Sequence, residues 1–368
     1  MLLMTFKRMW LILCVPRWLD IWLNRLPERD KPRVFYGHDY IPQINESASG
    51  GIVKFQRMQD ALPNSSRKFN ILYMVSSAPP IDWKQLVWLA RQKRAKVVWN
   101  QNGVGYRGWH GPGWEHVNRP MAVMLKEADY VFYQSHFCKV GADLFAHDRQ
   151  KDWEVLYNAV DTRVFTPSDH DPDPRCLVLL LGGNQYQFYR LERALQTLSV
   201  LTSRGLKVKL LVTGKLNWIP DESKSKATFR RLILELGIVD HVEVLGTYAQ
   251  RDAPAIMQRA HLLLHTKYND PCPGLVAEAM ACGLPVVYSH SGGVPELVGE
   301  DAGIGIPAEL NWDQDIPPDP NALAEAVQHL VEHRARYSEA ARQRAVDHFD
   351  LRPWIQRHID VFEECLSK

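Results

Sequence analysis

The feature that most constrains this chain is the alternation of short apolar runs with stretches of helical spacing. Runs rich in Val, Ile, Leu and aromatic residues recur along the sequence, and this alternation is typical of parallel sheets covered by helices. We therefore expect an α/β fold. The expected strands are Arg33–Tyr40, Phe69–Ser76, Lys96–Asn100, Tyr130–Gln134 and Glu154–Leu156 in the first half, and Cys176–Leu181, Lys207–Thr213, His241–Leu245, Ala260–His265 and Pro285–Tyr288 in the second.

The expected strands fall into two groups, which indicates two domains. The chain has 368 residues, whereas single domains mostly contain about 100 to 200 residues. A polar, proline-containing stretch at 168–175 separates the two groups. We expect a helical segment at residues 1–30, a first Rossmann-like domain at 31–165, a second at 166–350 and a final helical segment at 351–368. Helices are expected at Asn321–His333, at Tyr337–Phe349 and from Pro353 onward.

Composition excludes several classes of protein. Hydrophobic residues make up 46% and charged residues 23% of the chain, which is the balance of a soluble globular protein. The net charge is +2, so we expect no nucleic-acid partner. The six cysteines are scattered, with no C-x-x-C pair and no histidines nearby at metal-ligand spacing. We interpret them as reduced thiols of a cytoplasmic protein and expect no metal site.

An apolar run near the N-terminus, Met9–Val15, is flanked by basic residues, as a signal peptide or a membrane helix would be. A bilayer span needs about 20 apolar residues, and Pro16 and Asp20 interrupt this run too early. Trp18 and Trp22, together with the basic residues, fit a helix that lies on a membrane surface. An amphipathic helix packed on the protein's own core predicts the same spacing, so both interpretations stay open.

The densest functional signal lies between Tyr268 and Glu296. Strong helix formers fill Leu275–Cys282 and end at Gly283, so the preceding proline and glycine mark the amino end of a helix. Unpaired amides and the positive end of the helix dipole at such an end favour an anion such as a diphosphate. The amides expected to bind it belong to Gly274, Leu275 and Val276.

Two acidic residues, Asp270 and Glu278, flank this helix start. A carboxylate accepts hydrogen bonds from hydroxyl groups, which suits Glu278 to the hydroxyls of a ribose and Asp270 to those of a sugar. The alternative is that Asp270 caps the helix and Glu278 is a solvated helical charge.

At these residues the sequence resembles glycosyltransferase family 4, a group of retaining glycosyltransferases. The family pattern E-G-F-G-L-V-x-x-E-A-M-A-x-G-x-P-V-V followed by G-G-x-P-E is matched closely from Glu278 to Glu296. The segment 157–167 resembles the interdomain signature N-G-V-D-x-x-x-F-x-P, and the resemblance covers about residues 33 to 365. Two departures are Asp270, where the family has glutamate, and Pro273, where it has glycine. The resemblance implies a GT-B fold, in which two Rossmann-like domains face a cleft and the C-terminal helix packs back on the first domain.

The resemblance also implies donor-binding positions outside this motif. Gly50 and Gly51 look like the family's amino-terminal glycine loop, and Gly183 lies in its phosphate-binding strand end. Asn184 replaces the family's first phosphate-binding cation, an arginine. Arg190 falls where the family has its second phosphate-binding cation, so it would be the main positive group on the diphosphate. The alternative for Arg190 is an ordinary cation on the surface of a helix.

Two further positions are expected near the donor. Tyr248 falls where the family contacts the nucleotide base, although an aromatic residue packed over the sheet edge is the alternative. Asn102 replaces a histidine near the reacting sugar; an amide cannot exchange protons at neutral pH, but it can hydrogen-bond a hydroxyl. The stretch Tyr106–Trp114 looks like an acceptor-side loop.

Together these positions predict an enzyme that moves a sugar from a UDP-, GDP- or ADP-sugar to an acceptor hydroxyl, without a metal or another cofactor. The expected acceptor is a saccharide or a lipid-linked molecule in polysaccharide or glycoconjugate biosynthesis. The expected location is the cytoplasm, with peripheral membrane contact through the N-terminal segment as one interpretation. The alternatives are a nucleotide-sugar epimerase or a phosphorylase of the same fold, or a catalytically silent nucleotide-sugar binding protein.

Overall fold

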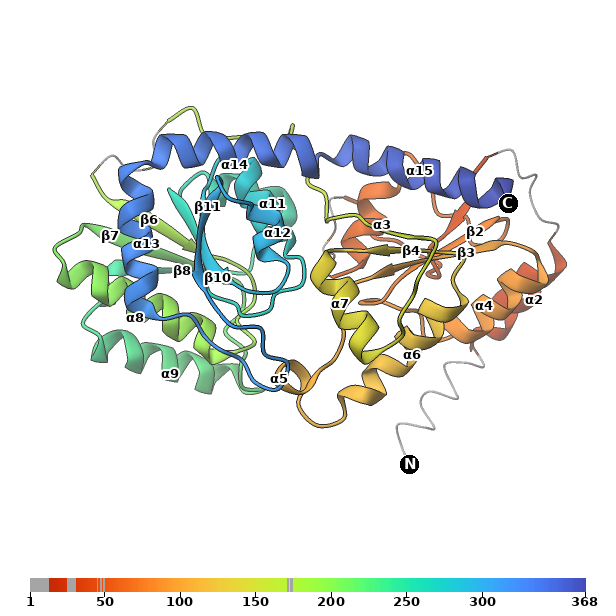
Figure 1. Cartoon of the computed structure of the whole chain (residues 1–368), viewed down its shortest axis with the longest axis horizontal. Helices are drawn as coiled ribbons and strands as arrows, with labels where there is room; N and C mark the ends of the chain where they lie inside the picture. The colour runs from red at the N-terminus through yellow and green to blue at the C-terminus, as the bar shows by residue number, and fades with distance from the viewer. Residues whose placement is uncertain are drawn as a thin grey trace. The chain divides into compact units, whose positions relative to one another are not determined.

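The computed structural model describes residues 13–24, 31–44, 46, 48, 50–170, 172 and 175–368. Most of the apolar run Met9–Val15 lies outside these residues. The chain forms two compact units (Figure 1). Unit 1 contains the residues up to Tyr106, together with Pro112–Leu156 and Leu351–Lys368, and unit 2 contains Arg107–Gly111 and Tyr157–Asp350.

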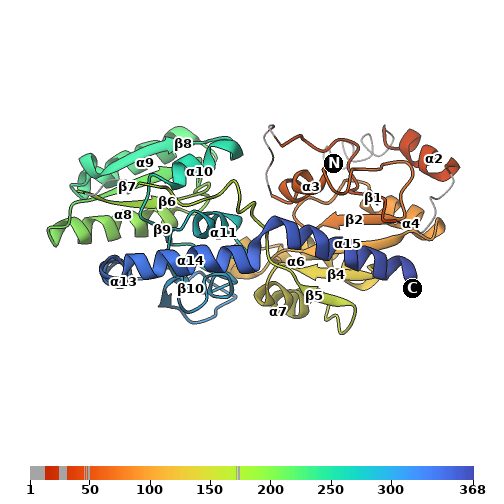
Figure 2. The same ribbon diagram turned by 90° about the horizontal axis from the view of Figure 1, so that it is seen from above.

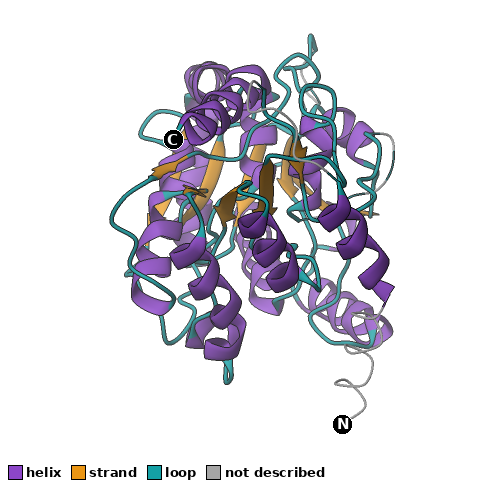
Figure 3. Ribbon diagram, turned by 90° about the vertical axis from the view of Figure 1, so that its right-hand side faces the viewer, coloured by secondary structure: helices purple, strands orange, loops and turns teal. Residues whose placement is uncertain are grey.

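Unit 1 is built on a sheet of five parallel strands in the order β1-β2-β3-β4-β5. All five expected strands of the first half are present, although the first is much shorter than expected. Figure 3 shows the strands enclosed between helices. The bounds are β1 Val34–Phe35, β2 Ile71–Val75, β3 Lys96–Gln101, β4 Tyr130–Tyr133 and β5 Trp153–Val155.

Helices cover both faces of this sheet. The helices of unit 1 are α2 Val15–Leu23, α3 Ile52–Met58, α4 Trp83–Gln92, α6 Trp114–Glu127, α7 His136–Phe145 and α15 Leu351–Ser367. One face packs against α2, α4, α6 and α7 through buried side chains such as Leu72 and Trp99. The other face packs against α3 and α15 (Figures 1 and 2), where the rings of Tyr73 and Phe362 lie 5.5 Å apart. The expectation that the C-terminal helix packs back on the first domain is confirmed.

Helix α2 is amphipathic and packs on unit 1. Ile21 is buried in the core, while Trp18 donates a hydrogen bond from Nε1 to the buried carboxylate of Asp82, at 2.7 Å. Arg17 forms an ion pair with the same carboxylate. The interpretation of an amphipathic helix packed on the protein's own core is therefore confirmed for the side of α2 that carries Ile21. None of the described helices combines the length and apolar character needed to span a membrane.

Unit 2 is built on six parallel strands in the order β11-β10-β9-β6-β7-β8. Their bounds are β6 Leu177–Leu181, β7 Val208–Thr213, β8 Val242–Gly246, β9 Leu262–His265, β10 Val286–His290 and β11 Gly303–Pro307. The five expected strands of the second half are present. Strand β11 was not expected, because its sequence Gly-Ile-Gly-Ile-Pro has the glycine and proline of a loop. It pairs with β10 at the edge of the sheet, where a proline is tolerated.

Two groups of helices cover the two faces of this second sheet (Figures 1 and 2). Leu179, Leu181 and their neighbours pack with α8, α9 and α13, while Val178 and Leu180 point to the opposite face and pack with α10, α11, α12 and α14. This alternation follows from the two-residue period of a strand. The bounds are α5 Arg107–His110, α8 Phe188–Ser203, α9 Glu222–Glu235, α10 Ala253–Met257, α11 Gly274–Ala281, α12 Val294–Val298, α13 Pro320–Glu332 and α14 Arg334–Phe349.

The boundaries of the two units differ from the expected domains in two places. Unit 2 begins at Tyr157 rather than at residue 166, since Val160 pairs with Asp350 and Phe165 is buried in the core of unit 2. The segment Arg107–Gly111, expected in the first domain, also belongs to unit 2. Gly108 explains the second difference, because its amide donates a hydrogen bond to the carbonyl of Trp312, at 2.8 Å.

Candidate functional site

The start of α11 lies at the carboxyl edge of the second sheet, just after β9. Pro273 is the N-cap of this helix and has extended backbone angles. The first two amides of α11, of Gly274 and Leu275, have no acceptor within the described part of the chain. A Cβ built on Gly274 would meet no atom within 4 Å. The structure therefore leaves room for an anion at the place where the dipole of the helix favours one.

The amide of Val276 differs from the expectation. It donates a hydrogen bond to the carbonyl of Pro273, at 3.1 Å, and the side chain is fully buried. A tight first turn of this kind satisfies one of the amides that a helix start leaves unpaired. The free donors at this end are therefore those of Gly274 and Leu275.

Asp270 is buried before this helix and is held by two basic groups. His265 Nε2 lies 3.2 Å from Asp270 Oδ2, and Lys267 Nζ lies 3.1 Å from Asp270 Oδ1. Burial raises the pKa of the Asp270 carboxyl, but the charge of Lys267 and the close contact with His265 outweigh it, so the pKa lies well below its usual range. Asp270 is therefore ionised at neutral pH. Its side chain is not used to cap α11, because Pro273 occupies the N-cap.

Glu278 lies one turn inside α11 and is also buried, so it is not a solvated helical charge. It accepts a hydrogen bond from Gln250 Nε2, at 2.7 Å. The hydroxyl of Tyr248 has a pKa raised to about 12, mainly by burial and in smaller part by the nearby negative charge of Glu278. The structure thus brings together the residues expected at the ribose and at the base.

A cavity of about 490 Å³ lies at the carboxyl ends of β7 and β8, and its lining extends to Thr247, the residue before Tyr248. Its volume falls within the usual range for a small-molecule pocket. Its walls carry apolar side chains, three basic side chains and the carboxylate of Glu222, which is paired with Lys226 at 2.7 Å. The apolar side chains are those of Leu216, Phe229 and Leu245, and the basic ones are those of Lys215, Lys226 and Arg230.

Gly183 and Arg190 lie at the neighbouring strand end, after β6. Gly183 has a positive φ of 81° and open space where a Cβ would be. The guanidinium of Arg190 is buried and donates hydrogen bonds to the carbonyl of Asn184, at 2.7 Å, and to that of Gly182, at 3.4 Å. Arg190 therefore braces the loop that presents Gly183 and is not a surface cation. Its role at a phosphate stays a prediction.

The expected residues of the first half lie together in unit 1. Gly51 is the N-cap of α3 and packs so closely on the end of β2 that a Cβ would lie 2.1 Å from Val75 Cγ2. Gly50 precedes it with a positive φ of 56°. Asn102 follows β3; its backbone amide donates to Ser76 Oγ, at 2.8 Å, and its side-chain Oδ1 accepts from the amide of Gly103, at 2.8 Å. These residues share the carboxyl edge of the first sheet, where α/β folds bind ligands.

The contact between Lys267 and Trp109 was not predicted from the sequence, although Trp109 was expected in the acceptor-side loop. Lys267 Nζ lies 4.8 Å from the centroid of the Trp109 ring, which is within the range of a cation–π interaction. Trp109 belongs to the expected acceptor-side loop, and Arg107 in the same loop lies 3.8 Å from Asp313. Because 109 and 267 are far apart in the sequence, no local pattern could have indicated this contact.

Asp315 is a further carboxylate near these groups that the sequence did not single out. Burial raises its pKa to about 6, although a hydrogen bond from Gln187 and the charge of Lys267 act in the opposite direction. The distance from Gln187 Nε2 to Asp315 Oδ2 is 2.6 Å. Asp315 therefore changes its charge close to neutral pH, unlike Asp270.

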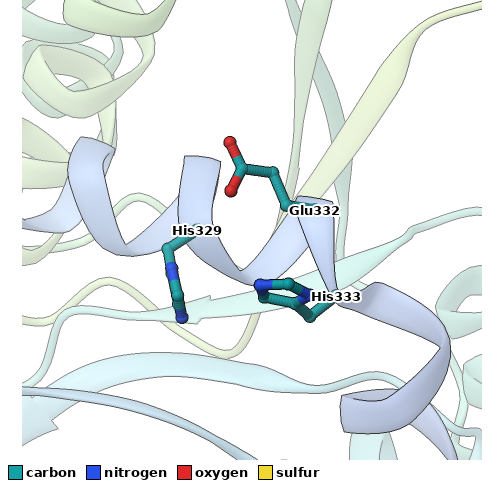
Figure 4. A group of neighbouring side chains, drawn as sticks. All are labelled: His329, Glu332 and His333. Carbon is teal, nitrogen blue, oxygen red and sulfur yellow. The ribbon is translucent and has the colours of Figure 1, made fainter.

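One group of side chains within the described ranges has the spacing of metal ligands, namely His329, Glu332 and His333 (Figure 4). Their ligand atoms all lie within 4.8 Å of one another, and all three side chains are exposed at the end of α13.

Comparisons with known proteins agree with this geometry. Residues 175–344 match the model of the family "Glycosyl transferases group 1". The gpi3 subunit of phosphatidylinositol N-acetylglucosaminyltransferase from Schizosaccharomyces pombe is 23% identical over 181 residues, which are 49% of this chain and 38% of that protein. The chain thus spans less than two thirds of this relative's length.

Two solved structures show the same fold. Sucrose-phosphate synthase from Thermosynechococcus elongatus has a TM-score of 0.64 at 17% identity, over 85% of this chain and 76% of its own. HepE of Anabaena in complex with UDP has a TM-score of 0.63 at 19% identity, over 80% and 79% of the two chains. Residues 175–344 thus match the model of the glycosyl transferases group 1 family, and the chain has the GT-B fold of these solved structures.

Proposed function

We propose that the chain is a retaining glycosyltransferase of family 4, which transfers a sugar from a nucleotide-sugar to an acceptor hydroxyl without a metal or another cofactor. The observation that carries this proposal is the open start of α11, flanked by the two buried acids Asp270 and Glu278. The family match of residues 175–344 supports it. The same match disfavours an epimerase, a phosphorylase or a silent binding protein.

The donor would be bound along the carboxyl edge of the second sheet. The base would lie in the cavity beside Tyr248, and the ribose hydroxyls would donate hydrogen bonds to Glu278. The amides of Gly274 and Leu275 would bind the diphosphate, with Gly183 allowing a close approach of the backbone. The hydroxyls of the transferred sugar would then reach Asp270.

In the reaction the bond from the anomeric carbon to the diphosphate oxygen breaks, and a bond from the same carbon to the acceptor oxygen forms on the same face. The proton of the acceptor hydroxyl passes to the departing phosphate oxygen. Negative charge grows on the diphosphate as it leaves, and fixed donors aimed at such a charge contribute about 2.7 to 4 kcal/mol each. The amides at the start of α11 are such donors, because they point at the anion before the reaction begins.

The acceptor in this proposal is a saccharide or a lipid-linked molecule of glycoconjugate biosynthesis, and the donor is a UDP-, GDP- or ADP-sugar. A relative named for its action on phosphatidylinositol supports a lipid-linked acceptor, and a structural neighbour in complex with UDP supports a uridine nucleotide. We place the enzyme in the cytoplasm, at the membrane surface.

Thermal unfolding of the full chain with UDP, GDP and ADP tests the donor site. The preferred nucleotide raises the melting temperature, because a ligand that binds only the folded state stabilises it. In Glu278→Gln the apparent Kd rises about 10- to 100-fold, since a hydrogen bond to a charged group contributes about 1.5 to 3 kcal/mol. Glu243→Gln, which changes an exposed carboxylate of the same unit, is the control. Equal nucleotide affinity in both variants would exclude the ribose role of Glu278.

A further inference from the structure

The outer face of α2 and the neighbouring part of α4 form an exposed apolar surface on unit 1. Leu19, Trp22 and Leu23 lie on one side of α2, as expected for residues three and four apart on a helix. They are exposed to 56%, 47% and 78%. Trp88 of α4 is 56% exposed, and its ring stacks on that of Trp22 with centroids 5.8 Å apart. We call these four residues the α2–α4 face.

Polar contacts between α2 and the body of unit 1 fix this orientation. Arg17 and Trp18 both bind the carboxylate of Asp82, which is completely buried. Turning α2 to bury the α2–α4 face would remove both partners from a buried charge, and an unpaired buried charge is strongly destabilising. The fold therefore holds three large apolar side chains of a single short helix in solvent.

The charges around this face are mainly positive, although Arg17 is paired with Asp82 and Asp39, and Arg91 with Asp129. The two segments that form it, 13–24 and 83–94, contain five basic residues and one acidic residue, whereas basic and acidic residues are nearly equal in the whole chain. The acidic one, Asp20, is paired with Arg67 at 2.7 Å. Lys93 Nζ lies 5.5 Å from the centroid of the Trp22 ring, at the rim of the face. The basic residues are Arg17, Lys84, Arg91, Lys93 and Arg94.

We propose that the α2–α4 face binds the surface of an anionic lipid bilayer. Exposed leucines enter the boundary between head groups and acyl chains, tryptophan rings prefer that boundary, and lysine and arginine pair with lipid phosphates. A second protein chain would not need the excess of positive charge. The inference rests on the proposed function only in that a lipid-linked acceptor would be met at the same surface.

Sedimentation with lipid vesicles tests this proposal on the full chain, without donor or acceptor. The wild-type chain sediments with vesicles of phosphatidylcholine and phosphatidylglycerol, and much less with phosphatidylcholine alone or at high salt, because each basic residue near an anionic surface contributes about fivefold to binding. In the double variant Leu19→Gln and Leu23→Gln the partition coefficient falls at least about 100-fold, from the lost burial of two leucines.

A matched double variant, Leu144→Gln and Leu234→Gln, is the control, since these leucines are 61% and 68% exposed on other helices. It keeps the wild-type partition coefficient. Sedimentation of the Leu19 and Leu23 variant equal to that of the wild type would overturn the proposal. So would a wild-type dimer in light scattering that this variant disrupts, with no vesicle binding. Stabilisation by nucleotides is measured in a separate experiment. Absence of vesicle binding would therefore not contradict the proposed donor site, and absence of nucleotide binding would not contradict the proposed membrane surface.

Discussion

Replacing Gly292 by alanine tests whether the backbone behind Asp270 sets the position of its carboxylate. Gly292 follows β10 with a positive φ of 68°, and a Cβ there would lie 2.5 Å from the carbonyl oxygen of Asp270 and 2.7 Å from its amide nitrogen. The amide of Gly293 donates to the same carbonyl oxygen, at 2.9 Å. Ordinary contact of a Cβ begins at 3.4 Å, so in a close-packed interior the backbone at Asp270 must move by about 1 Å.

The magnitude has two parts. An alanine in the left-handed region costs about 1 to 2 kcal/mol, which lowers the melting temperature by about 2 to 8 °C for a unit of this size. A displacement of about 1 Å at a reacting group lowers the rate about 100-fold. Gly237 is the control, because it has a φ of 67° and no atom within 4 Å of a Cβ. Gly237→Ala therefore has the stability cost of a left-handed alanine but does not displace the backbone at Asp270.

The assay compares kcat, KM for the donor and thermal unfolding of the two variants. We expect both variants to lose stability through the left-handed alanine, and Gly292→Ala to lose more because its Cβ collides with the backbone of Asp270. We expect kcat, measured well below the melting temperature, to fall only in Gly292→Ala. Wild-type kcat in Gly292→Ala would refute the role of Asp270 in turnover. An equal fall in Gly237→Ala would show that lost stability, and not the position of Asp270, lowers the rate.

Two further predictions concern charged groups. In Lys267→Met the pKa of Asp270 rises, so the acid limb of the kcat profile moves to higher pH; Lys209→Met, which removes an exposed lysine of β7, leaves the profile unchanged. His358 is buried in unit 1 and its pKa is lowered to about 3 by burial, so the unfolded chain binds more protons below pH 6.5. Stability is thus full above that pH and falls by about 2 kcal/mol between pH 7 and pH 5. Calorimetry at the two pH values should show a smaller loss in His358→Gln, and an unchanged loss would assign the acid sensitivity to other groups.

Most of the fold could be predicted from the sequence, because each buried strand carries its own signal. A continuous apolar run such as Val-Leu-Leu-Leu at 178–181 indicates a strand buried on both faces. Strand β11 lacks that signal, since two of its five residues are glycine and one is proline. Its place is determined by pairing with β10, which is a tertiary contact.

The candidate site could be predicted only in part. The spacing of Asp270 and Glu278 around a helix start is local, and the sequence indicates it directly. The partners of Asp270, His265 and Lys267, lie only five and three residues before it. No regular helical or strand spacing determines the direction of side chains in this loop, so their contacts with the carboxylate could not be predicted. Arg190 shows the same limit: its helix could be predicted, whereas the direction of its guanidinium toward two carbonyls depends on the loop after β6.

The course of α15 has a consequence for how the protein is made. His358 Nε2 lies 3.0 Å from the hydroxyl of Tyr73, and Arg357 lies 2.9 Å from Glu154, so the last helix completes the core of the unit that is synthesised first. During translation the first sheet leaves the ribosome with one face covered only by α3, and unit 2 is complete before α15 closes the rest of that face. The faces of Tyr73 and Phe132 that contact α15 therefore stay uncovered until the final segment emerges, and such transiently exposed apolar surface favours aggregation.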